Sequence, residues 1–283
     1  MIDWLRGGVA RFGKSPGWQL VAGAVILALA FPSRLSGSVG VMILAGALGV
    51  AAVLLWPRLP VWLRHPPEEV TSSLVITLVV MLGLSTFWDT LMTSPDWQMG
   101  DWGPQRAVLA GIMDALPGLD TPVWNHAVST GDAPLELYPK LAYLVTGHAA
   151  LALGLDDDLP RAMMIVAVVV HVGIATATTL IAMRIAPKPI AFVIGLMTLV
   201  ESGAVAHGGT VGLFRWALLH SALALAFSLI AALGILAALR RPRLGASIAI
   251  WIGMALATAT HPAGLISAAA SVLALAAVAL LAA

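Results

Sequence analysis

Residues 89–106, DTLMTSPDWQMGDWGPQR, and residues 121–140, TPVWNHAVSTGDAPLELYPK, separate two long blocks of apolar sequence. Both belong to a polar insert, Asp89 to Arg161, which holds ten of the chain's 14 acidic residues. The sequence outside this insert is mostly Leu, Ala, Val, Ile and Gly. A long polar segment between apolar helices has to lie in water beside a membrane. We therefore expect an all-α polytopic membrane protein whose helices hold residues 89–161 at the lipid boundary.

The composition of the chain agrees with this expectation. Hydrophobic residues make up 60% of the 283 residues and charged residues only 10%, and the mean hydropathy is +0.95. Soluble domains carry about 25% charged residues, so this chain cannot cover itself with polar surface and needs lipid as its solvent. A net charge of +1 suggests no nucleic-acid partner. Because the chain has no Cys, disulfides and thiolate chemistry are excluded.

Eight apolar runs approach the roughly 20 residues that cross a bilayer. Trp18, Trp56 and Trp88 lie at the ends of the first three runs, where indole rings prefer the membrane interface. The last run ends without a charged residue, so we expect residues 1–283 to be a single transmembrane domain, the N-terminal part of a longer protein. The expected membrane-spanning helices are residues 18–31, 38–56, 72–88, 162–185, 189–202, 214–239, 246–260 and 265–283.

The distribution of Lys and Arg predicts the orientation of these helices. Arg6, Arg11 and Lys14 place the N-terminus in the cytoplasm, and the third helix then delivers residues 89–161 to the extracytoplasmic side. The apolar run 141–155 is only 15 residues long, which suits a helix lying at the interface better than a crossing. With that assignment, all later basic loops are cytoplasmic. We predict a multi-pass protein of the plasma (inner) membrane.

A second interfacial helix is expected within the insert, from Pro104 to Leu116. Proline suits the first turn of a helix, and Pro117-Gly118 ends the pattern. The apolar residues recur at spacings of three and four and so share one face, which we expect to lie in the lipid interface. These residues are Val108, Leu109, Ile112, Met113 and Leu116. The two flat helices and the polar segment between them would enclose a pocket at the outer leaflet.

The order of short motifs in the insert resembles the first outer loop of GT-C fold glycosyltransferases. The motifs are DWGPQ before an amphipathic helix, then PVWN, GDAP and LYPKLAYL. The most similar pattern is that of a prokaryotic membrane group labelled "6-pyruvoyl-tetrahydropterin synthase related". The resemblance covers residues 101–184 and continues more weakly through residues 207–223. Lys140 replaces a usual second proline, Glu201 is the only acid near the second outer loop, and two helices precede the usual first one.

This resemblance implies transfer of a sugar from a polyprenyl-phosphate donor to a glycan, lipid or protein acceptor on the extracytoplasmic face. A lipid-linked sugar presents its reactive carbon at the interface, so the catalytic group has to lie there as well. A carboxylate can accept the proton of the attacking hydroxyl. The leaving phosphate calls for cations or a divalent metal such as Mg or Mn. The sequence has no His pair at metal-ligand spacing, so the cofactor stays unknown.

Asp101 is the predicted catalytic base, and its simpler role would be to cap the following helix. Each predicted substrate-binding residue also has an ordinary alternative. Loop residues are often merely solvated, an interfacial Tyr needs no ligand, and an Arg at a helix end can extend to the interface or pair with acids. Acids at membrane level are functional candidates by default. The predicted substrate-binding residues are Gln105, His126, Asp132, Tyr138, Arg161, Glu201 and Arg215.

Two other classes of protein fit the same sequence. A non-catalytic polytopic membrane subunit could use residues 89–161 to dock a partner. A transporter or flippase is the other alternative, although the sequence shows few intramembrane charges and no pair of broken helices in two similar halves.

Overall fold

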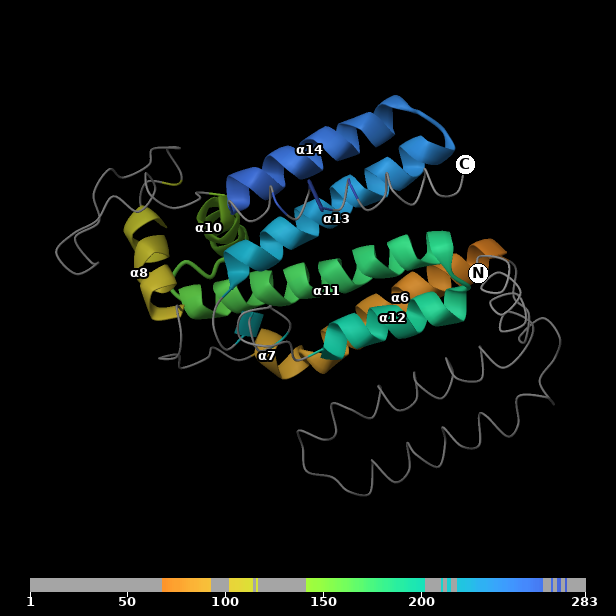
Figure 1. Cartoon of the computed structure of the whole chain (residues 1–283). Helices are drawn as coiled ribbons and strands as arrows, with labels where there is room; N and C mark the ends of the chain where they lie inside the picture. The colour runs from red at the N-terminus through yellow and green to blue at the C-terminus, as the bar shows by residue number, and fades with distance from the viewer. Residues whose placement is uncertain are drawn as a thin grey trace, which may run out of the picture. The chain divides into compact units, whose positions relative to one another are not determined.

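The structure is a computed structural model, and all of the regular secondary structure that it describes is helical (Figure 1). This confirms the all-α class. The described residues are 68–92, 102–113, 116, 141–201, 210, 213–214, 218–261, 266, 269–270 and 273. The helices are α6 (Glu68–Thr86), α7 (Trp88–Met92), α8 (Trp102–Met113), α10 (Leu141–Leu153), α11 (Leu159–Ile185), α12 (Lys188–Val200), α13 (Leu219–Arg240) and α14 (Leu244–Thr260).

The described helices overlap the apolar runs expected from the sequence, and several begin a few residues earlier. α13 begins five residues later than the expected span 214–239, and the short helix α7 was not expected. α11 and α13 are long and apolar enough to cross a membrane, with mean hydropathies of 2.2 and 2.6 over their most apolar windows. The apolar helices α6, α12 and α14 are shorter. The expected spans at residues 18–31 and 38–56, and most of 265–283, lie outside the described residues.

The chain divides into two compact units. The first unit comprises Met1–Trp88 and Thr178–Leu199, and the second comprises Asp89–Ala177 and Val200–Ala283. In the first unit, fully buried side chains come from α6, from the end of α11 and from α12. Gly195 of α12 faces Thr179 and Val79 so closely that an added Cβ would collide with Thr179 Oγ1. Small residues therefore let these three segments pack at short distance.

In the second unit, α13 and α14 lie side by side as an antiparallel hairpin (Figure 1). Gly253 of α14 sits directly on the backbone of α13, because a Cβ at this position would lie 2.7 Å from Ala231 N and 2.8 Å from Phe227 O. Gly234 of α13 makes the reciprocal approach, 2.9 Å from Ala246 O. Small residues at such positions are typical of helix pairs that associate in lipid.

α10 ends at Leu153, two residues before the end of the expected run 141–155, and Gly154 explains why. Gly154 adopts φ = 63°, a conformation that costs other residues energy and that glycine adopts freely. Its N–H donates to Leu151 O, and Leu155 N–H donates to Ala150 O. These two bonds form a Schellman motif, which closes a helix C-terminus. α10 is therefore only 13 residues long, about 20 Å, which is less than the roughly 30 Å hydrocarbon core of a bilayer.

α8 packs its apolar face on protein. Leu109 and Ile112 are fully buried, as is Leu116 just beyond the helix, in a cluster with Tyr143 of α10 and Met163 of α11. The expectation that this face of the helix meets lipid is therefore wrong. The spacing of apolar residues correctly indicated a buried face, but periodicity does not indicate what covers it. Neighbouring helices cover it here.

Candidate functional site

The start of α8 is held by a contact over a long distance in the sequence. The Trp102 side chain is 1% exposed, and its Nε1–H donates to the carbonyl oxygen of Phe214, 2.9 Å away. Pro104 lies in the first helical turn, where the absence of an N–H removes no intrahelical bond. The helix thus begins one residue after Asp101, at a point that packing and a partly buried hydrogen bond both fix.

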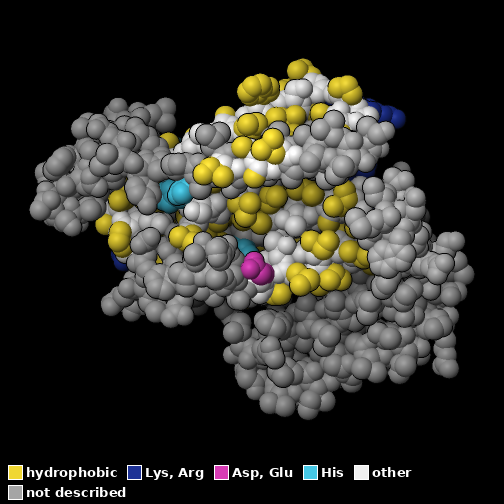
Figure 2. Space-filling model, viewed as in Figure 1, with side chains coloured by type: hydrophobic (Ala, Val, Ile, Leu, Met, Phe, Trp, Pro, Cys, Tyr) yellow, Lys and Arg dark blue, Asp and Glu magenta, His cyan; other side chains and the backbone are white. Residues whose placement is uncertain are grey.

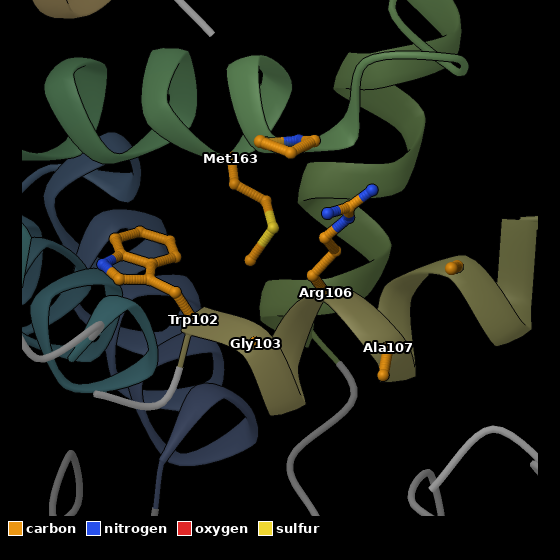
Figure 3. Close-up of a pocket in the computed structure, with 7 residues that line it drawn as sticks. Trp102, Gly103, Arg106, Ala107 and Met163 are labelled. Carbon is orange, nitrogen blue, oxygen red and sulfur yellow. The ribbon is translucent and has the colours of Figure 1, made fainter. Parts of the chain in front are cut away.

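A pocket of about 220 Å³ lies between α8 and the first turns of α11. Figure 3 shows the side chains of Trp102, Arg106 and Met163 around this space, with Arg106 extending from α8 toward α11. Among the described residues of the lining, Arg106 is the only charged one, and the other side chains are apolar or absent. The described residues that line it are Trp102, Gly103, Arg106, Ala107, Ala110, Pro160 and Met163.

The first turn of α11 forms the opposite wall and has a well-defined cap. Asp158 Oδ1 accepts a hydrogen bond from Arg161 N–H at 3.3 Å, and Asp158 O accepts one from Ala162 N–H at 3.1 Å. A side-chain acceptor at this position satisfies a backbone N–H that has no partner within the helix. Asp158, the last residue of the acidic run 156–158, therefore caps α11. The cap fixes where Pro160 and Met163 enter the pocket.

Arg161 contacts backbone rather than the pocket. Its Nε–H points to the carbonyl oxygen of Leu91 in α7, at 3.4 Å, a distance typical of a weak hydrogen bond. The side chain is partly buried and lies outside the pocket lining. Arg161 therefore links the start of α11 to α7, and its predicted role toward substrate stays a prediction.

The other predicted site residues are not gathered at the pocket in the part of the chain that the structure describes. Gln105 is 8% exposed and does not line the pocket. Glu201 is exposed at the end of α12, and its carbonyl oxygen accepts hydrogen bonds from Thr210 N and Oγ1. The remaining predicted residues lie outside the described residues: Asp101, His126, Asp132, Tyr138 and Arg215.

The predicted divalent metal finds no cluster of ligands in this part of the chain. Among the described residues, no group of three or more His, Asp or Glu side chains is placed to hold a metal ion. Two histidines pack instead against aromatic rings. His171 meets Phe214 edge-on with ring centroids 5.7 Å apart, and His220 meets Tyr143 at 4.7 Å. The His171 side chain is only 4% exposed, so it packs inside the protein.

Arg106 was not among the residues predicted from the sequence. The signal was present, because Arg106 is a basic residue within the segment assigned to the extracytoplasmic side, against the usual preference of Lys and Arg for cytoplasmic loops. Arg161 and Arg215, which were predicted to bind substrate, are also basic residues expected on the extracytoplasmic side. The pocket itself depends on α11 meeting α8, which no local pattern indicates.

Comparison with protein-family models, with curated proteins and with solved structures finds no significant match to this chain.

Proposed function

We propose that this chain is a multi-pass membrane glycosyltransferase that moves a sugar from a polyprenyl-phosphate donor to an acceptor on the extracytoplasmic face. The observation that carries the proposal is the anchored start of α8 beside a pocket. Trp102 follows Asp101 in the sequence, is buried and hydrogen-bonded, and lines that pocket. The resemblance of residues 101–184 to the outer loop of GT-C enzymes supplies the type of reaction.

The surfaces of the helices support a membrane location. On α14, the face toward α13 is built from small apolar residues, while Leu244, Trp251 and Ile252 on the other side are between 51% and 78% exposed. A helix that is apolar on all sides belongs inside a large core or in lipid. Figure 2 shows hydrophobic side chains spread over the visible surface of the helices. α11, with 27 residues, is about 40 Å long, which is long enough to span a hydrocarbon core of about 30 Å.

The proposed reaction is a displacement at the anomeric carbon of the donor sugar. The acceptor hydroxyl oxygen forms a bond to this carbon while the bond from the carbon to the phosphate oxygen breaks. The bonding electron pair leaves with the polyprenyl phosphate, and the hydroxyl proton passes to the Asp101 carboxylate, as in general-base catalysis. General-base catalysis gains when the base is held close to the acceptor hydroxyl, and the residue after Asp101, Trp102, is held in place by its hydrogen bond to Phe214.

The test is sugar transfer by the full chain in nanodiscs, with radiolabelled polyprenyl-phosphate sugars and envelope glycans or lipids as acceptors. We expect Asp101→Asn to lower the rate by a factor of about 100 or more, the usual contribution of a positioned base. Asp157→Asn is the matched control, because Asp157 is exposed and lies outside the pocket lining. Full activity of Asp101→Asn would remove this residue from the mechanism. Movement of the intact donor across the bilayer without bond cleavage would show a flippase instead.

A further inference from the structure

We propose that the pocket between α8 and the start of α11 binds the phosphate group of a lipid phosphate, with Arg106 as the binding cation. The identification of this lipid as the sugar donor rests on the proposed function. The binding site itself does not depend on it, because it follows from the charge, walls and size of the pocket.

Arg106 supplies the charge among the described residues that line the pocket. The Arg106 side chain is exposed, and among the described residues no hydrogen bond or ion pair occupies its guanidinium. Its side chain extends into the space toward α11 (Figure 3). A guanidinium presents several N–H donors in a planar fork, which matches the oxygens of a phosphate and can bind two of them at once. The pocket is therefore suited to an anion.

The walls of the pocket favour a phosphate that carries an apolar chain over a free phosphate ion. Trp102, Pro160 and Met163 contribute apolar surface to the pocket. Ala107 and Ala110 also line it and add no polar side-chain groups. A free phosphate surrounded by such walls would lose hydration and gain one cation in return. A lipid phosphate places its first carbons against the same walls, where burial of apolar surface is favourable.

The size of the pocket limits what it can hold. Its volume of about 220 Å³ lies below the roughly 300 Å³ at the lower end of typical ligand pockets. It therefore accepts a headgroup and the first carbons of a chain, while the remainder of a polyprenyl chain has to lie outside it. A chain anchored in this way would extend along the apolar surfaces of the helices.

Gly103 allows the pocket to be filled without disturbing the fold. It lines the pocket, is exposed, and has no atom within 4 Å of the position of an added Cβ. A leucine at Gly103 would occupy the pocket without a backbone clash. Gly245 is the matched control, because it is also the second residue of a helix, is exposed and has open space around an added Cβ. Arg241 is the control for Arg106, because it is an exposed arginine that follows α13 and lies outside the pocket lining.

The experiment measures binding of undecaprenyl phosphate to the full chain by native mass spectrometry, with polyprenol and inorganic phosphate as comparison ligands. We expect Arg106→Gln to raise the Kd about tenfold, the effect of losing one charged contact. Gly103→Leu should raise the Kd at least as much, because the leucine side chain would occupy the pocket. Arg106→Lys should retain most of the binding, and Gly245→Leu and Arg241→Gln should bind as the wild type does. Circular dichroism verifies that each variant is folded.

Two results would overturn the proposal. One is unchanged binding of undecaprenyl phosphate to both Arg106→Gln and Gly103→Leu. The other is inorganic phosphate or polyprenol binding as tightly as the lipid phosphate, since the site would then recognise only one half of the ligand. The outcomes also separate this inference from the proposed function. Wild-type binding without sugar transfer would refute the transferase alone, whereas transfer with unchanged binding in both variants would refute the site alone.

Discussion

Trp102 is predicted to be the main anchor of the candidate site, and Trp102→Phe tests this. The substitution removes the Nε1–H donor, so the Phe214 carbonyl loses its 2.9 Å hydrogen bond. That bond contributes about 1 kcal/mol. The substitution also removes two ring carbons from a side chain that is 1% exposed, and each buried carbon contributes about 0.8 kcal/mol to stability. We expect the free energy of unfolding to fall by about 2–3 kcal/mol.

Trp251→Phe is the matched control, because Trp251 has the same chemistry but is 73% exposed on α14. Its replacement should change the free energy of unfolding by less than about 0.5 kcal/mol. The assay is unfolding of the full chain in mixed micelles by titration with SDS, followed by circular dichroism. If Trp102→Phe and Trp251→Phe unfold at the same SDS fraction, the hydrogen bond from Trp102 to Phe214 does not anchor α8.

Two further predictions concern close helix packing. Gly253→Val should destabilise the α13–α14 hairpin by about 2 kcal/mol or more, because the added Cβ would lie 2.7 and 2.8 Å from backbone atoms of α13. Gly245→Val is the control and should be neutral in the same SDS titration, because Gly245 has open space around an added Cβ. Gly195→Ala should destabilise the first unit through its collision with Thr179 Oγ1. Thr179→Ala should restore part of this loss in a double-mutant cycle, and strictly additive effects would contradict the contact.

The boundaries of the helices were largely predictable because their signals are local. Pro104 and the apolar spacing that follows it indicated α8, Gly154 marks the end of α10, and Asp158 caps α11. Each of these features acts within one or two turns of the chain, so the residue types alone are informative.

The environment of the site was not predictable, because it depends on contacts between residues far apart in the sequence. Trp102 meets Phe214 across 112 residues, and Arg106 shares a pocket with Pro160 and Met163 of another helix. The same limitation explains the error about the apolar face of α8. A pattern of apolar residues shows that Leu109 is buried, whereas only the fold shows that protein covers it.

The most direct measurement of the central claim, a lipid-phosphate site at the extracytoplasmic surface, uses a single cysteine at Gly103. The chain contains no other cysteine, and an added side chain at Gly103 meets open space inside the pocket. Intact cells expressing Gly103→Cys are treated with a membrane-impermeant maleimide, and purified protein is treated with and without undecaprenyl phosphate. We predict labelling from outside the cell and protection by the lipid phosphate. Labelling only after permeabilisation, or an equal rate with the lipid present, would contradict the account.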